Sequence, residues 1–357
     1  LNSKYIGNSA SELGGAVYIK TMFSIKQIAC IYEGNSANVS GGALSLHSIK
    51  LSVIIHSRFE NNKVQFGGGA IKSLDTKRMI NIRSIFKTNK GRYGGALNFD
   101  KSEYILSIFT TYIYNEVEID GGAIFFQRIQ SITNINSSFE GNYAAKSYSS
   151  MLLISIHTTF NINCNFRNNT CLSRQGMTSI SDFVTISIFK CYFLGNKGGL
   201  LFAIHGQKVL IRNCYFLKNT GHSGGALNLR ECDFILNTRN NIMNNKVTLS
   251  GGGIYVHSAK TFASTNNVYT LNAASYGASI YLEVIQTCII KNSSYFKNKA
   301  INGGGLYVSK IKFAAINNSS FSKNFVTGNG GGSYFANVQK LHLFNMHYEK
   351  NEAKFEG

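Results

Sequence analysis

The chain repeats one short signal, an aromatic or apolar anchor residue followed three positions later by asparagine, fourteen times in 357 residues. Successive anchors are 26 or 27 residues apart, except for one step of 23 residues. An independently folded core does not require such a period, so the repeat predicts a solenoid of stacked coils. The anchor pairs are Tyr5/Asn8, Tyr32/Asn35, Phe59/Asn62, Phe86/Asn89, Tyr112/Asn115, Phe139/Asn142, Phe166/Asn169, Phe193/Asn196, Phe216/Asn219, Ile242/Asn245, Tyr269/Asn272, Tyr295/Asn298, Phe321/Asn324 and Tyr348/Asn351.

A glycine pair follows the asparagine by five or six residues in most repeats, and alternating residues come after it, as in 94–99, Gly-Gly-Ala-Leu-Asn-Phe. This period of two predicts a strand with one buried face. A second alternating segment leads into the anchor, with isoleucine four residues before it in six early repeats. Ile82 and Ile135 are therefore predicted to point inward, and alanine at either should cost about 2 to 5 kcal/mol.

These signals predict an all-β chain, a single-stranded right-handed parallel β-helix (solenoid) of about 13 coils of 26-27 residues. Proline is absent, as stacked strands with fully paired backbone N–H groups would favour. Residues 1–357 are expected to form one domain, with both ends cut within the repeat and flanking domains in a longer chain. Residues 147–205 are irregular, since the glycine pair lapses there and one coil is short.

The net charge of +19 has two interpretations. It favours a surface that binds an acidic polymer such as an acidic polysaccharide, but abundant Lys and Asn without Pro or Trp are also typical of an AT-rich genome. The sequence has no basic run and no nucleic-acid motif, so a nucleic-acid partner is not favoured.

Three of the seven cysteines lie two residues before their anchors in consecutive repeats: Cys164, Cys191 and Cys214. We expect them to stack in one buried row as small apolar side chains, although a disulfide between adjacent coils is geometrically allowed. Cysteine spacing typical of a metal site is not found, and no cofactor is expected.

The recurring Gly-Gly-Ala-[Ile/Leu/Val] and Phe-x-x-Asn signals resemble the repeats of polymorphic membrane protein-type surface proteins, which occur in chlamydiae and, in similar form, in ciliates. The resemblance covers almost the whole chain and implies the pectin-lyase-like right-handed β-helix fold. It also implies an extracellular or cell-surface location and a role in adhesion. The outer-membrane barrel of the bacterial members has no counterpart in this sequence.

Enzymes of that superfamily act on polysaccharides through clustered carboxylates or through acidic residues that bind Ca²⁺. The five aspartates of this chain do not pair in sequence or in the repeat register, and the run Glu116, Glu118 and Asp120 is expected to be a solvated loop. The motif around His222 lacks the acidic partners of a polygalacturonase. Since coil length barely varies, no inserted loop builds a cleft, and we expect no catalysis.

The outer surface is then the expected place of function. Stacked aromatic residues after the glycine turn, or residues of the irregular coils, are candidate contacts for a sugar or a protein. Stabilisation of a sheet face by aromatic pairing is the alternative explanation for the first group. The candidate contacts are Tyr255, Tyr281, Tyr307, Tyr334, Tyr148, Arg174, Phe183 and Lys197.

Six Asn-x-Ser/Thr sequons are candidate glycosylation sites in a secreted protein: Asn38, Asn136, Asn168, Asn292, Asn317 and Asn318. Taken together, the sequence predicts a non-catalytic extracellular or cell-surface β-helix with an adhesion or structural role, which binds an acidic polysaccharide or another surface protein. A polysaccharide-binding or polysaccharide-degrading protein of the pectin-lyase superfamily is the alternative.

Overall fold

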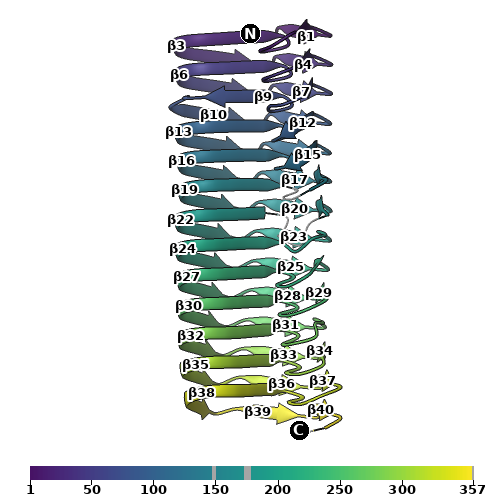
Figure 1. Cartoon of the computed structure of the whole chain (residues 1–357), viewed down its shortest axis with the longest axis vertical. Helices are drawn as coiled ribbons and strands as arrows, with labels where there is room; N and C mark the ends of the chain where they lie inside the picture. Colours follow the sequence, from purple (N-terminus) through teal and green to yellow (C-terminus); the bar gives the residue numbers. More distant parts are fainter. Residues whose placement is uncertain (147–149, 173–177, 356–357) are drawn as a thin grey trace. The chain divides into compact units, whose positions relative to one another are not determined.

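The computed structural model describes residues 1–146, 150–172 and 178–355. It divides into two compact units, Leu1–Phe183 and Val184–Gly357, and in each the described residues form a parallel β-solenoid (Figure 1). The two units together comprise about 13 coils, as the repeat predicts. Among the described residues, no helix is long and apolar enough to cross a membrane.

Coils of the first unit carry one long strand and two short ones, except that in one coil the long strand is divided into Ile71–Leu74 and Arg78–Ile82. The strands are β1 (Lys4–Ile6), β2 (Ser9–Ala10), β3 (Val17–Ile28), β4 (Ile31–Glu33), β5 (Ser36–Ala37), β6 (Leu44–Ile55), β7 (Arg58–Glu60), β8 (Lys63–Val64), β9 (Ile71–Leu74), β10 (Arg78–Ile82), β11 (Ile85–Lys87), β12 (Lys90–Tyr93), β13 (Leu97–Ile108), β14 (Thr111–Ile113), β15 (Glu116–Asp120), β16 (Ile124–Ile135), β17 (Ser138–Glu140), β18 (Tyr143–Ala144), β19 (Met151–Ile162), β20 (Asn165–Arg167) and β21 (Thr170–Cys171). Strand β22 (Thr178–Phe189) includes the boundary between the units.

The second unit follows this plan, except that two of its coils have one short strand in place of two. Its strands are β23 (Tyr192–Leu194), β24 (Leu201–Arg212), β25 (Tyr215–Leu217), β26 (Thr220–Gly221), β27 (Leu227–Thr238), β28 (Asn241–Met243), β29 (Lys246–Val247), β30 (Ile254–Thr265), β31 (Val268–Thr270), β32 (Ile280–Lys291), β33 (Ser294–Phe296), β34 (Lys299–Ala300), β35 (Leu306–Asn317), β36 (Ser320–Ser322), β37 (Phe325–Val326), β38 (Ser333–Phe344), β39 (His347–Glu349) and β40 (Glu352–Ala353).

Equivalent strands of successive coils pair in parallel, so each unit contains sheets that run along its stack. In the first unit the long strands follow the order β3, β6, β9 with β10, β13, β16 and β19, and in the second β24, β27, β30, β32, β35 and β38. The short strands around the anchors follow β1-β4-β7-β11-β14-β17-β20 and β23-β25-β28-β31-β33-β36-β39. The sheets of long strands and of anchor strands therefore continue from coil to coil, and the lack of proline leaves every backbone N–H able to take part.

Residues in the left-handed conformation make the corners of each coil. In the coil that contains β13, Lys101 (φ 62°), Phe109 (φ 51°) and Tyr114 (φ 50°) occupy three corners, the first of them inside β13 itself. Non-glycine residues pay a conformational cost in this region, which the continuous pairing on both sides of the corner offsets. The long strand is thus two straight segments joined at a corner.

The anchors form an internal aromatic stack. Phe59, Phe86 and Tyr112 are fully buried, with ring centroids 4.8 and 5.3 Å apart and nearly parallel planes. The same stacking joins Tyr269, Tyr295 and Phe321 in the second unit. The spacing is that of neighbouring strands, so the aromatic repeat is explained by coil stacking.

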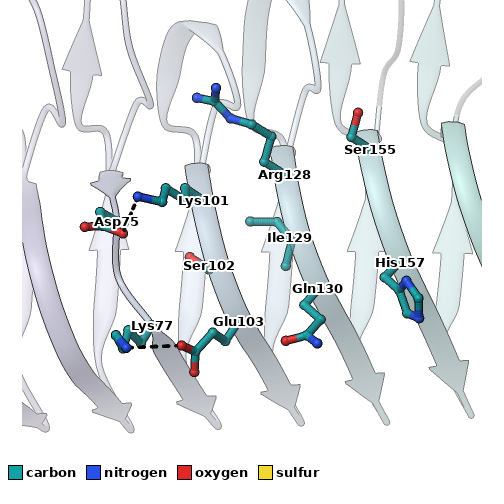
Figure 2. A pocket seen from close by; sticks show the side chains of 10 residues that line it. All are labelled: Asp75, Lys77, Lys101, Ser102, Glu103, Arg128, Ile129, Gln130, Ser155 and His157. Carbon is teal, nitrogen blue, oxygen red and sulfur yellow. Dashed lines mark ion pairs between the residues drawn. The ribbon is translucent and has the colours of Figure 1, made fainter.

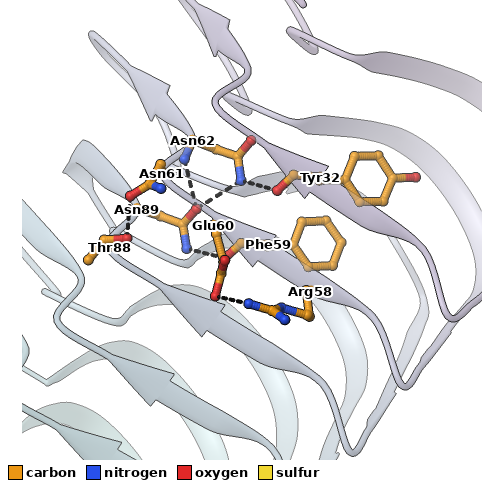
Figure 3. A network of polar contacts seen from close by, with 8 residues as sticks. All are labelled: Tyr32, Arg58, Phe59, Glu60, Asn61, Asn62, Thr88 and Asn89. Atoms are coloured by element: carbon orange, nitrogen blue, oxygen red, sulfur yellow. Dashed lines mark hydrogen bonds and ion pairs between the residues drawn. The ribbon is translucent and has the colours of Figure 1, made fainter. Parts of the chain in front are cut away.

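The asparagine three residues after each anchor forms a hydrogen-bonded ladder inside the coil wall (Figure 3). Asn89 Oδ1 accepts from Asn62 N (3.1 Å) and from Asn62 Nδ2 (2.9 Å). Asn89 Nδ2 in turn donates to Phe59 O (2.9 Å) and to Asn115 Oδ1 (3.0 Å). One side chain thus bonds groups of the coils on both sides of it, because an amide carries both a donor and an acceptor.

The glycine pair combines two separate requirements. Gly94 has φ +62°, which L residues rarely adopt. A Cβ at Gly95 would lie 2.3 Å from the carbonyl oxygen of Gly122 in the next coil, so the second glycine permits close approach of the backbones. Residues 147–149 and 173–177, where the pair lapses, lie outside the described part of the chain.

The predicted orientation of Ile82 and Ile135 is wrong. Both side chains lie half-buried on the outer face, and the inward residues before the corner are Asn81 and Asn134, each 1% exposed. The left-handed residues that follow, Arg83 (φ 48°) and Asn136 (φ 50°), make a corner that resets the alternation of inward and outward side chains. A single alternation of inward and outward residues, continued straight through this corner, therefore gives the wrong orientation for Ile82 and Ile135.

This orientation reduces the expected effect of an alanine substitution at Ile82 on stability. Ile82→Ala should lower the free energy of unfolding by less than about 1 kcal/mol, because the side chain is already partly hydrated. Ile105→Ala, in the neighbouring coil and 1% exposed, should lower it by about 2 to 5 kcal/mol. Urea denaturation of the two variants measures both changes. An equal loss of unfolding free energy in the two variants would contradict the outward orientation of Ile82.

All seven cysteines are buried and none forms a disulfide. Within the second unit, Cys191 and Cys214 precede the paired tyrosines Tyr192 and Tyr215 in adjacent strands, so they share one inward row. Burial raises the pKa of the Cys232 and Cys288 thiols to about 12, so these two thiols stay protonated near neutral pH. The buried thiol row is therefore confirmed for this pair, in the reduced form.

Candidate functional site

The four tyrosines that follow the glycine turn in the second unit lie in one row on its outer face. Tyr255, Tyr281, Tyr307 and Tyr334 are half-buried, and register pairing aligns each with the next. Their ring centroids are 5.4, 4.8 and 4.9 Å apart, with interplanar angles of 12°, 7° and 17°. The predicted outward aromatic row is present.

This geometry changes what the row offers to a ligand. Because each ring lies parallel to its neighbour at the strand spacing, the ring faces between Tyr255 and Tyr334 are covered by other rings. A sugar binds an aromatic residue through the ring face, which here is available only at the two ends of the row. The exposed parts are ring edges and hydroxyl groups, so the stacked row stabilises the sheet and is a poor platform for sugar stacking.

Charged groups beside the row are already paired. Glu283 accepts hydrogen bonds from Lys310 Nζ (2.8 Å) and from the Tyr281 hydroxyl (3.2 Å). The hydrogen bond from Lys310 lowers the pKa of the Glu283 carboxyl, and burial together with this carboxylate raises the pKa of Tyr281. The Arg230 guanidinium lies 5.3 Å from the Tyr255 ring centroid. This face is thus a polar network satisfied by its own members.

A shallow groove of about 600 Å³ lies at a corner of the first unit (Figure 2). Lys77 precedes β10, Lys101 and Glu103 lie on β13, Arg128 lies on β16, and His157 lies on β19. The buried side chains of Ser102 and Ile129 form its floor.

The carboxylates of this groove are separated from one another by cations. Lys101 Nζ lies 3.4 Å from Asp75 Oδ1, and Lys77 Nζ lies 3.3 Å from Glu103 Oε1. Burial opposes ionisation of the nearby Asp100, but the bidentate hydrogen bonds from Arg128 outweigh it and lower the pKa of the Asp100 carboxyl. General acid catalysis of glycoside hydrolysis needs a carboxyl of raised pKa, whereas the pKa of the Asp100 carboxyl is lowered.

A second groove of about 560 Å³ lies along a corner of the second unit, and we call it the asparagine groove. One wall is the row Asn266, Asn292, Asn318 and Asn345, all in the left-handed conformation with φ between 49° and 56°. The opposite wall comes from the first residues of β31, β33, β36 and β39: Val268, Ser294, Ser320 and His347.

The floor of the asparagine groove is also polar and is satisfied internally. Asn267 N donates to Ser293 Oγ (3.3 Å), and Ser293 N donates to Ser319 Oγ (3.2 Å). In the walls, Asn345 Nδ2 donates to Asn318 Oδ1 (2.9 Å). Apart from His347 the lining residues carry no ionisable side chain. The groove therefore offers neutral donors and acceptors repeated at the coil spacing.

The candidates in the irregular coils have mixed outcomes. Tyr148 and Arg174 lie outside the described residues. Phe183 is only 3% exposed and is therefore removed as a surface contact, because it occupies an inward position of β22. Lys197 is exposed and forms a backbone bridge with Thr220 in the next coil. Lys197 therefore stays a predicted contact, as do the untested Tyr148 and Arg174.

The six sequon asparagines lie on the outside of the coils. Asn38, Asn168, Asn292 and Asn318 are exposed, whereas Asn136 and Asn317 are half-buried. Two of them, Asn292 and Asn318, belong to the asparagine groove. A glycan on either would fill the groove, so glycosylation there and ligand binding exclude one another.

The acidic run on β15 is bound to a lysine of the preceding coil. Lys90 Nζ lies 2.7 Å from Glu116 Oε2, and Glu118 is exposed to solvent. Within the described ranges, no three His, Cys, Asp or Glu side chains gather in a way that could hold a metal ion. The run is a charged surface strand in this structure.

No protein family and no curated protein matches the sequence. Among solved structures, the chain is similar to the periplasmic alginate epimerase AlgG, with 10% sequence identity and a TM-score of 0.42. The similarity covers 80% of this chain and 76% of that protein. It concerns the β-helix fold alone and carries no argument about substrate or activity.

Proposed function

We propose that this chain is a non-catalytic β-solenoid that binds a neutral, extended polysaccharide along the asparagine groove, as part of an extracellular or cell-surface protein. The observation that carries the proposal is the array of uncharged hydrogen-bonding groups on both walls of that groove. Such amides and hydroxyls complement sugar hydroxyls, which both donate and accept hydrogen bonds. Extended polymers suit a groove whose contacts repeat in register.

The charge distribution favours a neutral over an acidic polymer. The chain carries a formal net charge of +19, yet the asparagine groove is lined by no lysine or arginine. An acidic polysaccharide would instead be drawn to cations, and those of the corner groove in the first unit are neutralised by Asp75, Glu103 and Asp100. Neither groove thus presents the cluster of free cations that acidic polymers require.

The location and the adhesive role remain part of the proposal. They rest on the resemblance of the Gly-Gly-Ala and Phe-x-x-Asn signals to polymorphic membrane protein-type repeats, and on the sequons Asn38, Asn136 and Asn168 of the first unit, which are not among the residues of the asparagine groove. A rigid coil stack that holds one glycan would act as an adhesive or structural element of a surface. A surface protein as partner is the alternative ligand.

Affinity gel electrophoresis of the unglycosylated protein against neutral and acidic polysaccharides tests the proposal. We expect retardation by at least one neutral β-linked glucan, mannan or xylan. The double variant Asn292→Gly/Asn318→Gly should weaken this binding at least about tenfold, or about 1.4 kcal/mol, because glycine keeps the left-handed corner but removes both amides.

Asn337→Gly is the matched control, since Asn337 has the same left-handed conformation (φ 52°) at another corner of the second unit. It should bind as the unchanged protein does. Retardation by acidic polymers alone would contradict the proposal that the ligand is a neutral polysaccharide. Equal binding by the double variant and by Asn337→Gly would show that the polysaccharide does not bind in the asparagine groove. Release of reducing ends or unsaturated products from any of these polymers would contradict a non-catalytic role.

A further inference from the structure

One edge of the second unit carries lysines without acidic neighbours, and we call it the lysine edge. In each coil it runs from the last residue of the anchor strand through the next corner, in segments 194–199, 217–222, 243–248, 270–275, 296–301 and 322–327. These segments contain six lysines and neither aspartate nor glutamate. All six are exposed: Lys197, Lys218, Lys246, Lys297, Lys299 and Lys323.

The equivalent edge of the first unit is electrically balanced. Its segments 6–11, 33–38, 60–65, 87–92, 113–118, 140–145 and 167–172 contain five lysines or arginines and five glutamates. One of these glutamates, Glu116, lies 2.7 Å from Lys90 of the adjoining coil. The coil therefore accepts glutamate at these positions, and stacking does not explain why the lysine edge has none.

The lysines of this edge are also unpaired. Elsewhere in the second unit, Lys260 Nζ lies 2.9 Å from Asp233 Oδ1, and Lys310 Nζ lies 2.8 Å from Glu283 Oε1. Among the residues described in this unit, by contrast, none pairs its carboxylate with a lysine of the lysine edge. Like charges gathered without counter-charges repel one another, and a bound anion removes that repulsion.

Two phenylalanine rings position three of these lysines. Lys297 Nζ and Lys323 Nζ lie 5.1 and 5.8 Å from the ring centroid of Phe296. Lys299 Nζ lies 5.5 Å from that of Phe325. Because a cation is attracted to the face of an aromatic ring, the three ammonium groups are held near one another before a ligand binds. This lowers the entropic cost of binding.

The shape of the lysine edge suits a linear polyanion. It extends over six successive coils, so at ~4.8 Å per coil it is roughly 24 Å long. A chain laid along the stack meets its cations in turn, which a small anion cannot do. Single-stranded nucleic acid needs free aromatic faces for its bases, whereas Phe296 and Phe325 are half-buried and face ammonium groups. Anionic sugars need only the charges.

We propose that the lysine edge binds an anionic polysaccharide, with carboxylate or sulfate groups along its chain. This inference goes beyond the proposed binding of a neutral polysaccharide and does not depend on it, because the asparagine groove contains no residue of the lysine edge. The two sites flank the same short strands: Ser294 of the groove begins β33, and Lys297 follows its end. One solenoid unit would thus hold a neutral and an anionic chain side by side.

Fluorescence anisotropy of the complete chain with labelled oligogalacturonate, labelled dextran sulfate and labelled uncharged dextran tests the inference. We expect tighter binding of one or both anionic chains than of dextran, with an affinity that falls as NaCl is added. The triple variant Lys297→Gln/Lys299→Gln/Lys323→Gln should weaken this binding at least about tenfold. Comparison of oligogalacturonate with dextran sulfate distinguishes carboxylate from sulfate as the preferred group.

The matched control is the triple variant Lys291→Gln/Lys312→Gln/Lys340→Gln. It removes the same charge from exposed lysines of β32, β35 and β38. This control should bind the anionic chains as the unchanged protein does. The variant of the lysine edge should also keep its retardation by a neutral polysaccharide. Circular dichroism verifies that both variants retain their β structure.

Equal weakening in the two triple variants would contradict the inference, because it would show an effect of net charge alone. A lack of binding to either anionic chain at low salt would also contradict it. Tighter binding of a single-stranded oligodeoxynucleotide, lost in the variant of the lysine edge, would assign the edge to nucleic acid and overturn the polysaccharide. Failure of every neutral polysaccharide to bind would leave these results unaffected, since the two sites share no residue.

Discussion

Asn89→Leu should lower the free energy of unfolding of the first unit by about 4 kcal/mol. Leucine fills a similar volume but removes the acceptor of both the backbone N–H and the side-chain amide of Asn62, and removes a donor to the Phe59 carbonyl, in a wall where these residues are buried. Asn115 Oδ1 also loses one donor. Each unsatisfied buried group costs about 1 to 3 kcal/mol, and several are created together.

The control for this prediction is Asn165→Leu. Asn165 lies on the outer side of β20, half-buried, and its replacement should change the free energy of unfolding by less than about 0.5 kcal/mol. Urea denaturation followed by circular dichroism measures both. Similar losses in the two variants would show that the ladder contributes no more than any asparagine on the coil.

Phe86→Ala should destabilise the first unit by about 3 to 5 kcal/mol, the range measured for large-to-small changes at buried aromatic positions. The ring is fully buried and stacks on Phe59 and Tyr112, so alanine leaves a cavity with ring faces exposed on both sides. The ladder bonds that flank the site hold the coils at a fixed spacing and prevent collapse into the cavity.

Ile85→Ala tests the same coil without opening the core. Ile85 is the residue before Phe86, points outward and is half-buried, so its removal should cost less than about 1 kcal/mol. The difference between the two alanine variants in urea midpoint is the measurement. A midpoint for Phe86→Ala within error of that for Ile85→Ala would show that the aromatic stack is not a main source of stability.

The period, the strand pairing and the roles of Phe86, Asn89 and Gly95 could be predicted from sequence. Each of these residues satisfies a requirement that recurs in every coil, so repetition makes the requirement visible. The orientation of Ile82 could not be predicted in this way. The corner residue after it is Arg83 in one coil, Phe109 in another and Asn136 in a third, and such varied residues do not indicate a left-handed conformation.

The candidate sites were less predictable for a related reason. The outward row of Tyr281 and Tyr307 follows from alternation, but the covering of the ring faces depends on ring angles that no spacing encodes. The asparagine groove combines Asn292 with Ser294 across a corner, and its walls become apparent only once the corner is in place. The row of asparagines at fixed spacing in the second unit is the available signal, but in the sequence Asn292 and Asn318 indicate only candidate glycosylation sites.

The length dependence of oligosaccharide binding tests the central claim most directly. Titration calorimetry with neutral oligosaccharides of increasing length, cut from whichever neutral polysaccharide retards the protein, should show affinity that rises with each added sugar and then stops rising. The groove walls span four coils, from Asn266 to Asn345, so the increase should end once the ligand covers those four rungs. Affinity that is already maximal for a monosaccharide, or no heat of binding at any length, would contradict an extended polysaccharide site in the asparagine groove.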